Sequence, residues 1–465
     1  YKMKYFDDED TIVALSTPWG RGAVAVIRLS GRRSLKIINT IFTRKISTSD
    51  HKKVFTGKFI SRKSGEIIDT VVVVFFRAPH SYTGEDVVEI SSHANHIIID
   101  QIINEILFLG ARVARPGEFT KRAFLNQKMD LAQAEAVANV IDSKTKQSLK
   151  YSLRQLEGRL SERINRIKSA TIDVASLIEV SLDFNENDIE IYNEDELHTK
   201  VKHIIQDIDR LIEGYQYGHL LKQGIKMVLL GKPNVGKSSL LNVLLEKDRA
   251  IVSHIPGTTR DYIEETIEIG GIPICVVDTA GVRQTEDTIE KKGVYKTLDH
   301  VATSDIVLAM FEASKELDDN DRVLFRKIEE YRDRVRILIL LNKIDLGVKK
   351  GVEKSLRQFG FPVVKISAKL EENIDDLRRE IQSLLLSNVD LVQEEVVVTN
   401  ARHKNALLQA KNSLIKFLEN LARGSEEVIL AADLRSALDF IGEIIGETST
   451  EDLLNNIFGQ FCIGK

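Results

Sequence analysis

Cysteine is scarce in this sequence, since its 465 residues include only Cys275 and Cys462. One pair cannot form the disulfide framework that holds small secreted domains together, so we expect a reducing compartment. The longest apolar runs, such as 71–76 and 337–341, are far below the ~18 residues of a membrane-spanning helix. The charged amino-terminal residues lack the apolar core of a signal peptide. These features predict a cytoplasmic protein without a membrane segment.

Neither sign of charge dominates, because 65 Lys and Arg residues stand against 69 Asp and Glu residues, for a net charge of −4. Such a balance gives no global attraction to nucleic acid, so any such binding must use a local patch. Proline is absent between Glu118 and Lys232, which permits long helices.

The length predicts about three domains, since one core rarely serves more than ~200 residues. Residues 11–125 mix β-rich runs (11–15, 23–29 and 71–76) with a helical stretch, 97–109, that ends at Gly110. Helical spacing then runs through Leu131–Ile141, and a second long stretch carries it from Leu149 to Ile167. Strands and helices alternate from about 225 to 385. Helical patterns return at 406–421, 434–445 and 451–458.

The final ~80 residues are too few for a core of their own, so we expect them to pack against the earlier helices. The alternating module is then an insertion in a helical domain. The predicted fold class is an α/β multidomain protein in which a parallel sheet flanked by helices is inserted in an α-helical domain, after an α+β domain. We place the boundaries at 1–125, 126–217, 218–385 and 386–465.

Two charged segments keep two interpretations each. Residues 183–196 hold seven carboxylates, which fit a metal site or, more simply, a solvated loop. Residues 144–168 hold eight Lys or Arg residues against two Glu, which fit a surface for nucleic-acid phosphates or a solvated helix face.

A phosphate-binding loop is the strongest single motif. The run Gly231-Lys-Pro-Asn-Val-Gly-Lys237-Ser238 matches G-x-x-x-x-G-K-[ST], after a predicted strand and before a predicted helix. Glycines let backbone N–H groups surround phosphates, and the helix amino terminus adds positive charge. Lys237 is expected to reach the β- and γ-phosphates, and Ser238 to bind Mg²⁺.

Three further motifs follow at the ends of predicted strands. They are Asp278-Thr-Ala-Gly281, Asn342-Lys-Ile-Asp345 and Ser367-Ala368-Lys369. Asp278 can hold a magnesium-bound water, and Gly281 can sense the γ-phosphate. Asp345 can accept both the ring N–H and the exocyclic amine of guanine, which adenine cannot supply. The sequence therefore predicts a guanine-nucleotide hydrolase.

The two switch segments predict an unusual hydrolysis mechanism. Gly257-Thr-Thr-Arg-Asp261 fits a first switch, where Thr259 completes the Mg²⁺ shell. After Gly281, where Ras-type switches carry a water-orienting Gln, stands Val282. Hydrolysis then needs another polar group, for which Gln284, Glu286 and Glu290 are candidates, and another positive charge. Asn234 fits either a turn residue or a ligand of a monovalent cation.

The flanking segments extend the pattern over nearly the whole chain. They are 10–14, 20–22, 28–31, 81–86, 115–120, 122–126, 130–136 and 461–465. With the GTPase motifs, this combination resembles the MnmE (TrmE) family of bacterial and organellar tRNA-modification GTPases. Two departures touch the amino-terminal domain: Trp19 replaces a frequent Pro, and Ser92-His93-Ala94-Asn95 replaces a His-Gly-Gly turn. We interpret His93 as structural.

The resemblance implies a homodimer whose amino-terminal domain binds a reduced folate, formyl- or methylene-tetrahydrofolate. It implies a flavoprotein partner, MnmG, and formation of carboxymethylaminomethyl-uridine or a related aminomethyl form at the tRNA wobble position. Hydrolysis of GTP is expected to be activated by pairing of G domains with K⁺. Within that family Asn234 matches a potassium-binding Asn, Ser253, Ile255 and Thr258 fall in its potassium loop, and Glu290 matches its water-positioning Glu.

The resemblance thus completes the set of expected site residues. Those for the nucleotide are Asn234, Val235, Gly236, Lys237, Ser238, Ser239, Ser253, His254, Ile255, Pro256, Gly257, Thr258, Thr259, Asp278, Thr279, Ala280, Gly281, Asn342, Lys343, Asp345, Ser367, Ala368 and Lys369. Those for folate are Arg28, Glu89, Lys128 and Lys465. Cys462 matches a near-terminal Cys that is either catalytic or a small buried residue, whereas Cys275 is expected in the core.

Two rival functions use the same GTPase motifs. A ribosome-assembly GTPase, acting as a binding switch, accounts for the G domain but not for the folate positions or the ending at Cys462–Lys465. A self-assembling mechanical GTPase predicts an amphipathic membrane anchor, and the sequence shows none.

Overall fold

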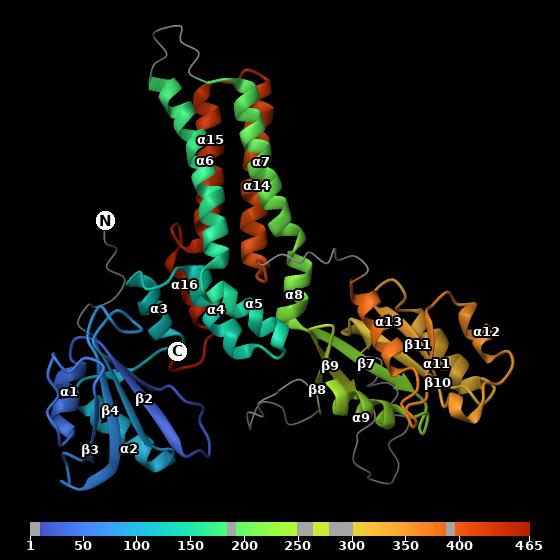
Figure 1. Cartoon of the computed structure of the whole chain (residues 1–465), viewed down its shortest axis with the longest axis horizontal. Coiled ribbons are helices and arrows are strands. Elements are labelled where there is room, and N and C mark those ends of the chain that lie inside the picture. Colours follow the sequence, from blue (N-terminus) through green and yellow to red (C-terminus); the bar gives the residue numbers. More distant parts are fainter. Residues whose placement is uncertain (1–9, 184–191, 249–263, 279–300, 387–395) are drawn as a thin grey trace. The chain divides into compact units, whose positions relative to one another are not determined.

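The computed structural model describes residues 10–183, 192–248, 264–278, 301–386 and 396–465 (Figure 1). The chain forms two compact units. The first combines residues 1–138 with 442–465, and the second consists of residues 139–441.

The first unit is built on a six-stranded sheet in the order β3-β4-β5-β2-β1-β6. Only the β1–β6 pair is parallel. The strands are β1 (Ile12–Leu15), β2 (Val24–Ser30), β3 (Val54–Ile60), β4 (Ile67–Phe76), β5 (Val87–His93) and β6 (Arg112–Val113). The predicted strands at 11–15, 23–29 and 71–76 are thus confirmed, and β4 begins earlier than its apolar run.

Two helices, α1 (Ser34–Ile41) and α2 (His96–Phe108), cover one face of this sheet. Their isoleucines pack against alternate strand residues such as Val73 and Ile90, because successive side chains in a strand point to opposite faces. Helix α2 confirms the predicted helix at 97–109, and Gly110 follows it with φ +90°. The other sheet face carries Arg28 and Glu89.

A smaller core joins segments from both ends of the chain. It contains helices α3 (Glu118–Leu125), α4 (Leu131–Asp142) and α16 (Glu451–Phe458). Leu131 and Ala134 pack with Leu454, Phe458 and Phe461. The predicted apolar face of α4 is therefore buried at its start, whereas Ile141 at its far end is 48% exposed.

The second unit contains a bundle of four long helices that run side by side in Figure 1. They are α6 (Arg159–Asp183), α7 (Glu194–Glu213), α14 (Ala401–Ala422) and α15 (Glu427–Ile445). Helix α7 packs against both α6 and α14. Arg435 of α15 pairs with Glu179 of α6 at 3.1 Å. The late helices therefore pack against the early ones, as predicted.

Shorter helices α5 (Lys146–Leu156) and α8 (Tyr215–Gln223) accompany the bundle. The predicted continuous stretch from Leu149 to Ile167 is wrong, because it breaks at Gly158, whose φ is +91°. A left-handed backbone suits glycine and ends a helix. Leu149 and Leu153 are 38% and 41% exposed, so the predicted apolar face does not continue through α5.

A second six-stranded sheet lies between α8 and α14 in the chain, in the order β12-β11-β10-β7-β9-β8. Its strands are β7 (Ile225–Gly231), β8 (Glu264–Ile269), β9 (Ile272–Asp278), β10 (Ile306–Glu312), β11 (Arg336–Asn342) and β12 (Val363–Lys365). All pairs are parallel except β8–β9. The described helices of this module are α9 (Lys237–Asp248), α11 (Asp319–Glu329), α12 (Val352–Arg357) and α13 (Ile374–Leu386), with a 3-10 turn at Ile344–Leu346.

Both faces of this sheet are buried under helices, which explains the near-continuous apolar runs of β10 and β11. The predicted fold class, an α/β GTPase module inserted in a helical domain after an α+β domain, is confirmed.

Candidate nucleotide-binding site

The predicted motifs meet at one edge of the second sheet. Strands β7, β9 and β11 are parallel, so their carboxyl ends lie at the same edge. The phosphate loop follows β7, β9 ends at Asp278, and β11 ends at Asn342. Strand order reverses beside β7, which is where open α/β sheets bind ligands. We call this edge the nucleotide edge.

The phosphate loop depends on residues with unusual backbone angles. Gly231 and Gly236 have φ of +154° and +107°, and Asn234 has φ +60°. A Cβ atom at 231 would lie 2.8 Å from the Met310 carbonyl oxygen, so only glycine fits there. The Lys237 ammonium donates to the carbonyls of Gly231 and Lys232, at 2.6 and 2.8 Å. The loop therefore curls around the amine predicted to meet phosphate.

Asn342 joins the phosphate loop to the predicted base-binding loop. Its Nδ2 donates to the Val235 carbonyl at 2.7 Å, and its Oδ1 accepts from the Ala368 N–H at 2.9 Å. The side chain is 2% exposed. A Cβ atom at Gly236 would lie 2.1 Å from Nδ2, so this bridge requires a glycine beside it.

The carboxylate predicted to read guanine is held from one side. Ser367 Oγ donates to Asp345 Oδ1 at 2.6 Å and accepts from the Leu370 N–H at 3.2 Å. Asp345 and Lys369 are exposed, whereas Ser367 and Ala368 are buried. The arrangement fixes one oxygen of Asp345 beside a backbone turn and leaves an exposed carboxylate at the edge.

Two lysines at this edge form ion pairs that were not found from the sequence. Lys343 Nζ lies 2.9 Å from Glu312 Oε2 at the end of β10. Lys232 Nζ lies 2.6 Å from Asp321 Oδ2 and also pairs with Asp318, at the start of α11. None of these three carboxylates belongs to a motif. Only Glu312 could have been expected at this edge, because it ends a parallel strand.

The remaining predicted residues divide by position. Asn234, Ser238 and Ser239 are exposed around the start of α9. Outside the described residues lie Ser253, His254, Ile255, Pro256, Gly257, Thr258, Thr259, Thr279, Ala280, Gly281, Val282, Gln284, Glu286 and Glu290. Most of the acidic segment 183–196 lies there too. No cluster of three or more metal-ligating side chains occurs within the described ranges.

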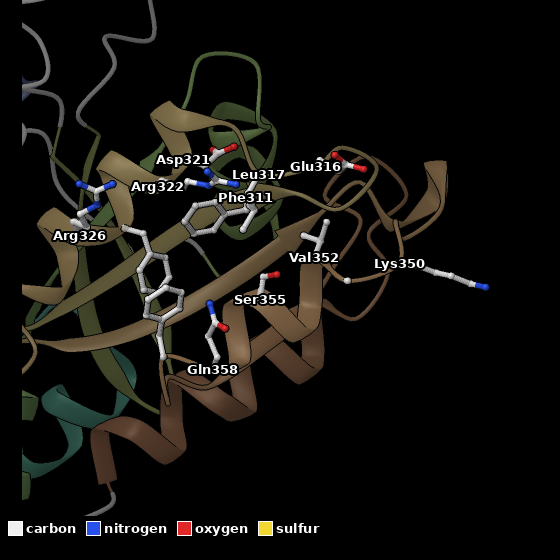
Figure 2. Close-up of a pocket in the computed structure, with 13 residues that line it drawn as sticks. Phe311, Glu316, Leu317, Asp321, Arg322, Arg326, Lys350, Val352, Ser355 and Gln358 are labelled. Atoms are coloured by element: carbon white, nitrogen blue, oxygen red, sulfur yellow. The ribbon is translucent and has the colours of Figure 1, made fainter.

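A hollow of about 600 Å³ lies beside this edge, between α11 and α12 (Figure 2). Its lining includes Phe311, Phe325 and Phe359, and Asp321 at one side. Figure 2 shows the charged ends of Arg326 and Lys350 pointing away from the hollow. Among the predicted nucleotide residues that the structure describes, none lines it.

Two of the predicted folate residues are paired in the first unit. Arg28 and Glu89 are register partners in β2 and β5, and Arg28 Nε donates to Glu89 Oε1 at 2.9 Å. They are 17% and 29% exposed. The Arg28 guanidinium also lies 5.1 Å from the Tyr82 ring centre and 5.6 Å from that of Phe119. Aromatic rings can pack against a flat ligand, and the neighbouring arginine and carboxylate can bind its polar groups, so this arrangement fits a flat polar ligand.

The other two contact neighbouring parts of the same wall. Lys128 Nζ donates to the Pro79 carbonyl at 3.1 Å, in the loop that carries Tyr82. The Phe119 N–H donates to the Lys465 carbonyl at 3.1 Å. All four residues are thus linked through Tyr82, its loop and Phe119. Neither aromatic residue was predicted, because Tyr82 lies in a loop and Phe119 in α3, and the sequence does not show that these segments pack beside β2.

The two cysteines differ from their expected environments. Cys462 is exposed, so the interpretation as a small buried residue is wrong. Cys275 is half-buried rather than enclosed in the core. His93 is held as a structural residue, since its Nδ1 lies 2.8 Å from Asp69 Oδ1 and its N–H donates to Asp69. Across the described residues, no helix is both long and apolar enough to cross a bilayer.

Comparison with known proteins covers 98% of the chain. The family profile described as the MnmE helical domain matches residues 131–462, and the profile of the GTP-binding protein TrmE N-terminus matches residues 11–128. A tRNA modification GTPase MnmE of Natranaerobius thermophilus is 41% identical over 460 residues, which are 98% of this chain and 100% of that protein. A protein of the same name from Carboxydothermus hydrogenoformans is 42% identical over 468 residues, with coverage of 98% and 100%. Among solved structures, the FeoB G-domain from Methanococcus jannaschii shares 26% identity, covers 35% of this chain and 97% of its own, and has a TM-score of 0.26.

Proposed function

This chain belongs to the MnmE family of tRNA modification GTPases, and from that premise we propose that it is a potassium-dependent GTPase acting on the wobble uridine of certain tRNAs. It hydrolyses GTP with Mg²⁺ in tRNA modification. The product we propose is carboxymethylaminomethyl-uridine or a related aminomethyl form, made in the cytoplasm by a homodimer with the flavoprotein MnmG. The proposed domain boundaries remain 1–125, 126–217, 218–385 and 386–465.

The observation that carries the proposal is the bridge made by Asn342. It holds the phosphate loop and the base-binding loop together, so a nucleotide can be read at both ends by one rigid edge. Asp345 then accepts hydrogen bonds from the guanine edge, while the Ser367 hydroxyl holds one of its carboxylate oxygens in place.

At the phosphate loop, the protein stabilises the negative charge of the phosphates with positive groups and forms no covalent bond to them. Lys237 exchanges its loop carbonyls for β- and γ-phosphate oxygens, and the N–H groups at the start of α9 add partial positive charge. The exposed Ser238 hydroxyl, with Thr259, would hold Mg²⁺, since hard oxygen ligands suit that ion. When bound, the ion neutralises charge developing on the phosphates.

Val282 stands where Ras-type GTPases carry a water-orienting Gln, so hydrolysis needs another source of positive charge and another residue that orients water. The exposed, left-handed Asn234 presents an amide at the phosphate loop, which fits a cation ligand. We propose that it binds K⁺ with Ser253, Ile255 and Thr258, where the ion supplies the charge that an arginine finger supplies elsewhere. Glu290 is proposed to orient the attacking water.

The first unit offers a second site for reduced folate. Glu89 can accept from the donors of a pterin, and Arg28, Lys128 and Lys465 can pair with a glutamyl tail. The aromatic rings of Tyr82 and Phe119 beside Arg28 fit a flat ring system. The exposed thiol of Cys462 is proposed to take part in the modification.

The test compares GTP hydrolysis by the full chain in K⁺ and in Na⁺, while solution mass is followed with GDP and aluminium fluoride. We expect turnover to rise strongly in K⁺ and the G domains to associate. Slow turnover that is equal in both salts refutes a cation-assisted mechanism and favours a GTPase that needs an outside activator, as in ribosome assembly. Binding of a reduced folate to wild type and to Arg28→Ala then tests the second site separately.

A further inference from the structure

Glu312 stands at the nucleotide edge without belonging to any motif. It is the last residue of β10 and the register partner of Asn342, the last residue of β11. The Ala313 N–H donates to the Asn342 carbonyl at 2.8 Å, which ties the ends of the two strands together. The Glu312 side chain is therefore attached to the same rigid edge as the guanine-reading loop.

The carboxylate of Glu312 collects three donors. Lys343 Nζ lies 2.9 Å from Oε2, Ser314 Oγ donates to Oε1 at 3.0 Å, and Lys315 Nζ lies 3.1 Å from Oε1. The hydrogen bond from Lys343, with those from Lys315 and Ser314, lowers the pKa of Glu312 to about 2. Glu312 is thus charged at any pH at which the protein works.

The backbone of Lys343 has a conformation that is unusual for a residue other than glycine. Its φ is +65°, a left-handed conformation that is strained for a residue with a side chain. It lies between Asn342, which contacts the phosphate loop, and Asp345, which is proposed to read the base. A side chain leaving the chain at that point has a four-carbon apolar stem to lay along a purine ring, if its charged end is held.

We propose that Glu312 is a positioning residue for the guanine base. By holding the Lys343 ammonium it keeps the apolar stem of Lys343 along one face of the purine, while Asp345 reads the ring edge. The inference rests on the proposed nucleotide site and adds to it a residue from a strand that carries no motif.

The burial of the pair distinguishes it from an ordinary surface ion pair. Glu312 and Lys343 side chains are 17% and 27% exposed. Glu316 and Lys349, on the same side of the module, form a pair at 3.0 Å with 75% and 51% exposure. Exposed pairs contribute little because water screens them, so Glu316 is a matched control for Glu312.

The experiment measures release of mant-GDP from the full chain with Mg²⁺. The variants are Glu312→Ala, Glu312→Gln, Lys343→Ala, the double variant Glu312→Ala with Lys343→Ala, and Glu316→Gln. We expect Glu312→Ala to release mant-GDP about 10-fold faster, as expected for loss of a charged hydrogen bond. Glu316→Gln should release it at the wild-type rate. The double variant should be no faster than Lys343→Ala alone, because Glu312 acts through Lys343.

Each other outcome is informative. Wild-type release from both Glu312 variants, with fast release from Lys343→Ala, overturns the role of Glu312 and leaves the base site intact. Fully additive effects in the double variant also overturn it, since they show a role independent of Lys343. Wild-type release from Lys343→Ala overturns the inference, because the stem of Lys343 then does not hold the base, whereas the base site itself is tested by Asp345→Asn. Thermal unfolding of the near-isosteric Glu312→Gln variant separates positioning from loss of folding.

Discussion

Replacing Asn342 by Ala tests the bridge on which the nucleotide site depends. The change removes two hydrogen bonds, to the Val235 carbonyl at 2.7 Å and from the Ala368 N–H at 2.9 Å. Val235 and Ala368 are 4% and 3% exposed, so water does not readily replace the lost partner. A buried polar group left without a partner costs about 1–3 kcal/mol, which gives a loss of roughly 2–6 kcal/mol for the two.

Part of that loss should appear in nucleotide affinity. Without the bridge, the nucleotide must order the two loops when it binds, and the free energy of that ordering weakens binding. If half of this stability loss weakens binding, the mant-GDP affinity should fall roughly 5- to 150-fold. Fluorescence titration gives the affinity, and calorimetric unfolding gives the stability.

Asn39 provides a matched control. Its Nδ2 donates to the Ile46 carbonyl at 2.7 Å and its Oδ1 accepts from the Ile46 N–H at 2.8 Å, in the first unit. Asn39→Ala should lower stability without changing nucleotide affinity. Equal affinities for Asn342→Ala and wild type would refute the reasoning, because the two loops would then hold their positions without the bridge.

Three further changes test other parts of the molecule. Glu290→Ala should slow GTP hydrolysis by ~10²-fold or more at near-normal GTP affinity, and unchanged turnover in a phosphate-release assay removes it from the proposed catalytic residues. Asp345→Asn should weaken GTP binding and admit xanthine nucleotide, and a retained preference for guanine in competition titrations contradicts its role. Glu118→Gln should lower stability by about 3–5 kcal/mol in urea unfolding, because it disrupts a buried ion network with Arg112 and Arg122. Burial alone would raise the pKa of Glu118, but hydrogen bonds from Arg112 and the Arg115 N–H and the charge of Arg122 lower it, so its contribution is present above the ordinary glutamate pKa and lost as pH falls through the lowered value. If wild type and Glu118→Gln lose stability equally on acidification, that linkage is wrong.

The module with the nucleotide edge was predictable because its signals are local. A glycine-rich loop between a strand and a helix, and polar motifs at strand ends, depend on neighbours in sequence. The apolar run at 337–341 lies within β11, which is one residue longer at each end, within the usual uncertainty of element ends.

What the sequence did not reveal depends on pairing between distant segments. The contact of Glu312 with Lys343 requires the register of β10 against β11, and that of Arg28 with Glu89 requires the register of β2 against β5. The break at Gly158 was missed because apolar spacing continues across it, and one left-handed residue outweighs that spacing.

The small core of the first unit has a consequence for synthesis on the ribosome. Leu131 and Ala134 meet Leu454, Phe458 and Phe461, and the Gly117 N–H and Ser16 hydroxyl donate to carbonyls of Cys462 and Gly464. At a translation rate of about 5–20 residues per second, the early partners wait roughly 15–60 s for the late ones. During that interval Leu131 and Ala134 lack the late residues that bury them in the folded protein. Chaperones or other helices of the nascent chain must then shield this apolar surface. A truncation late in translation would therefore damage the domain made first.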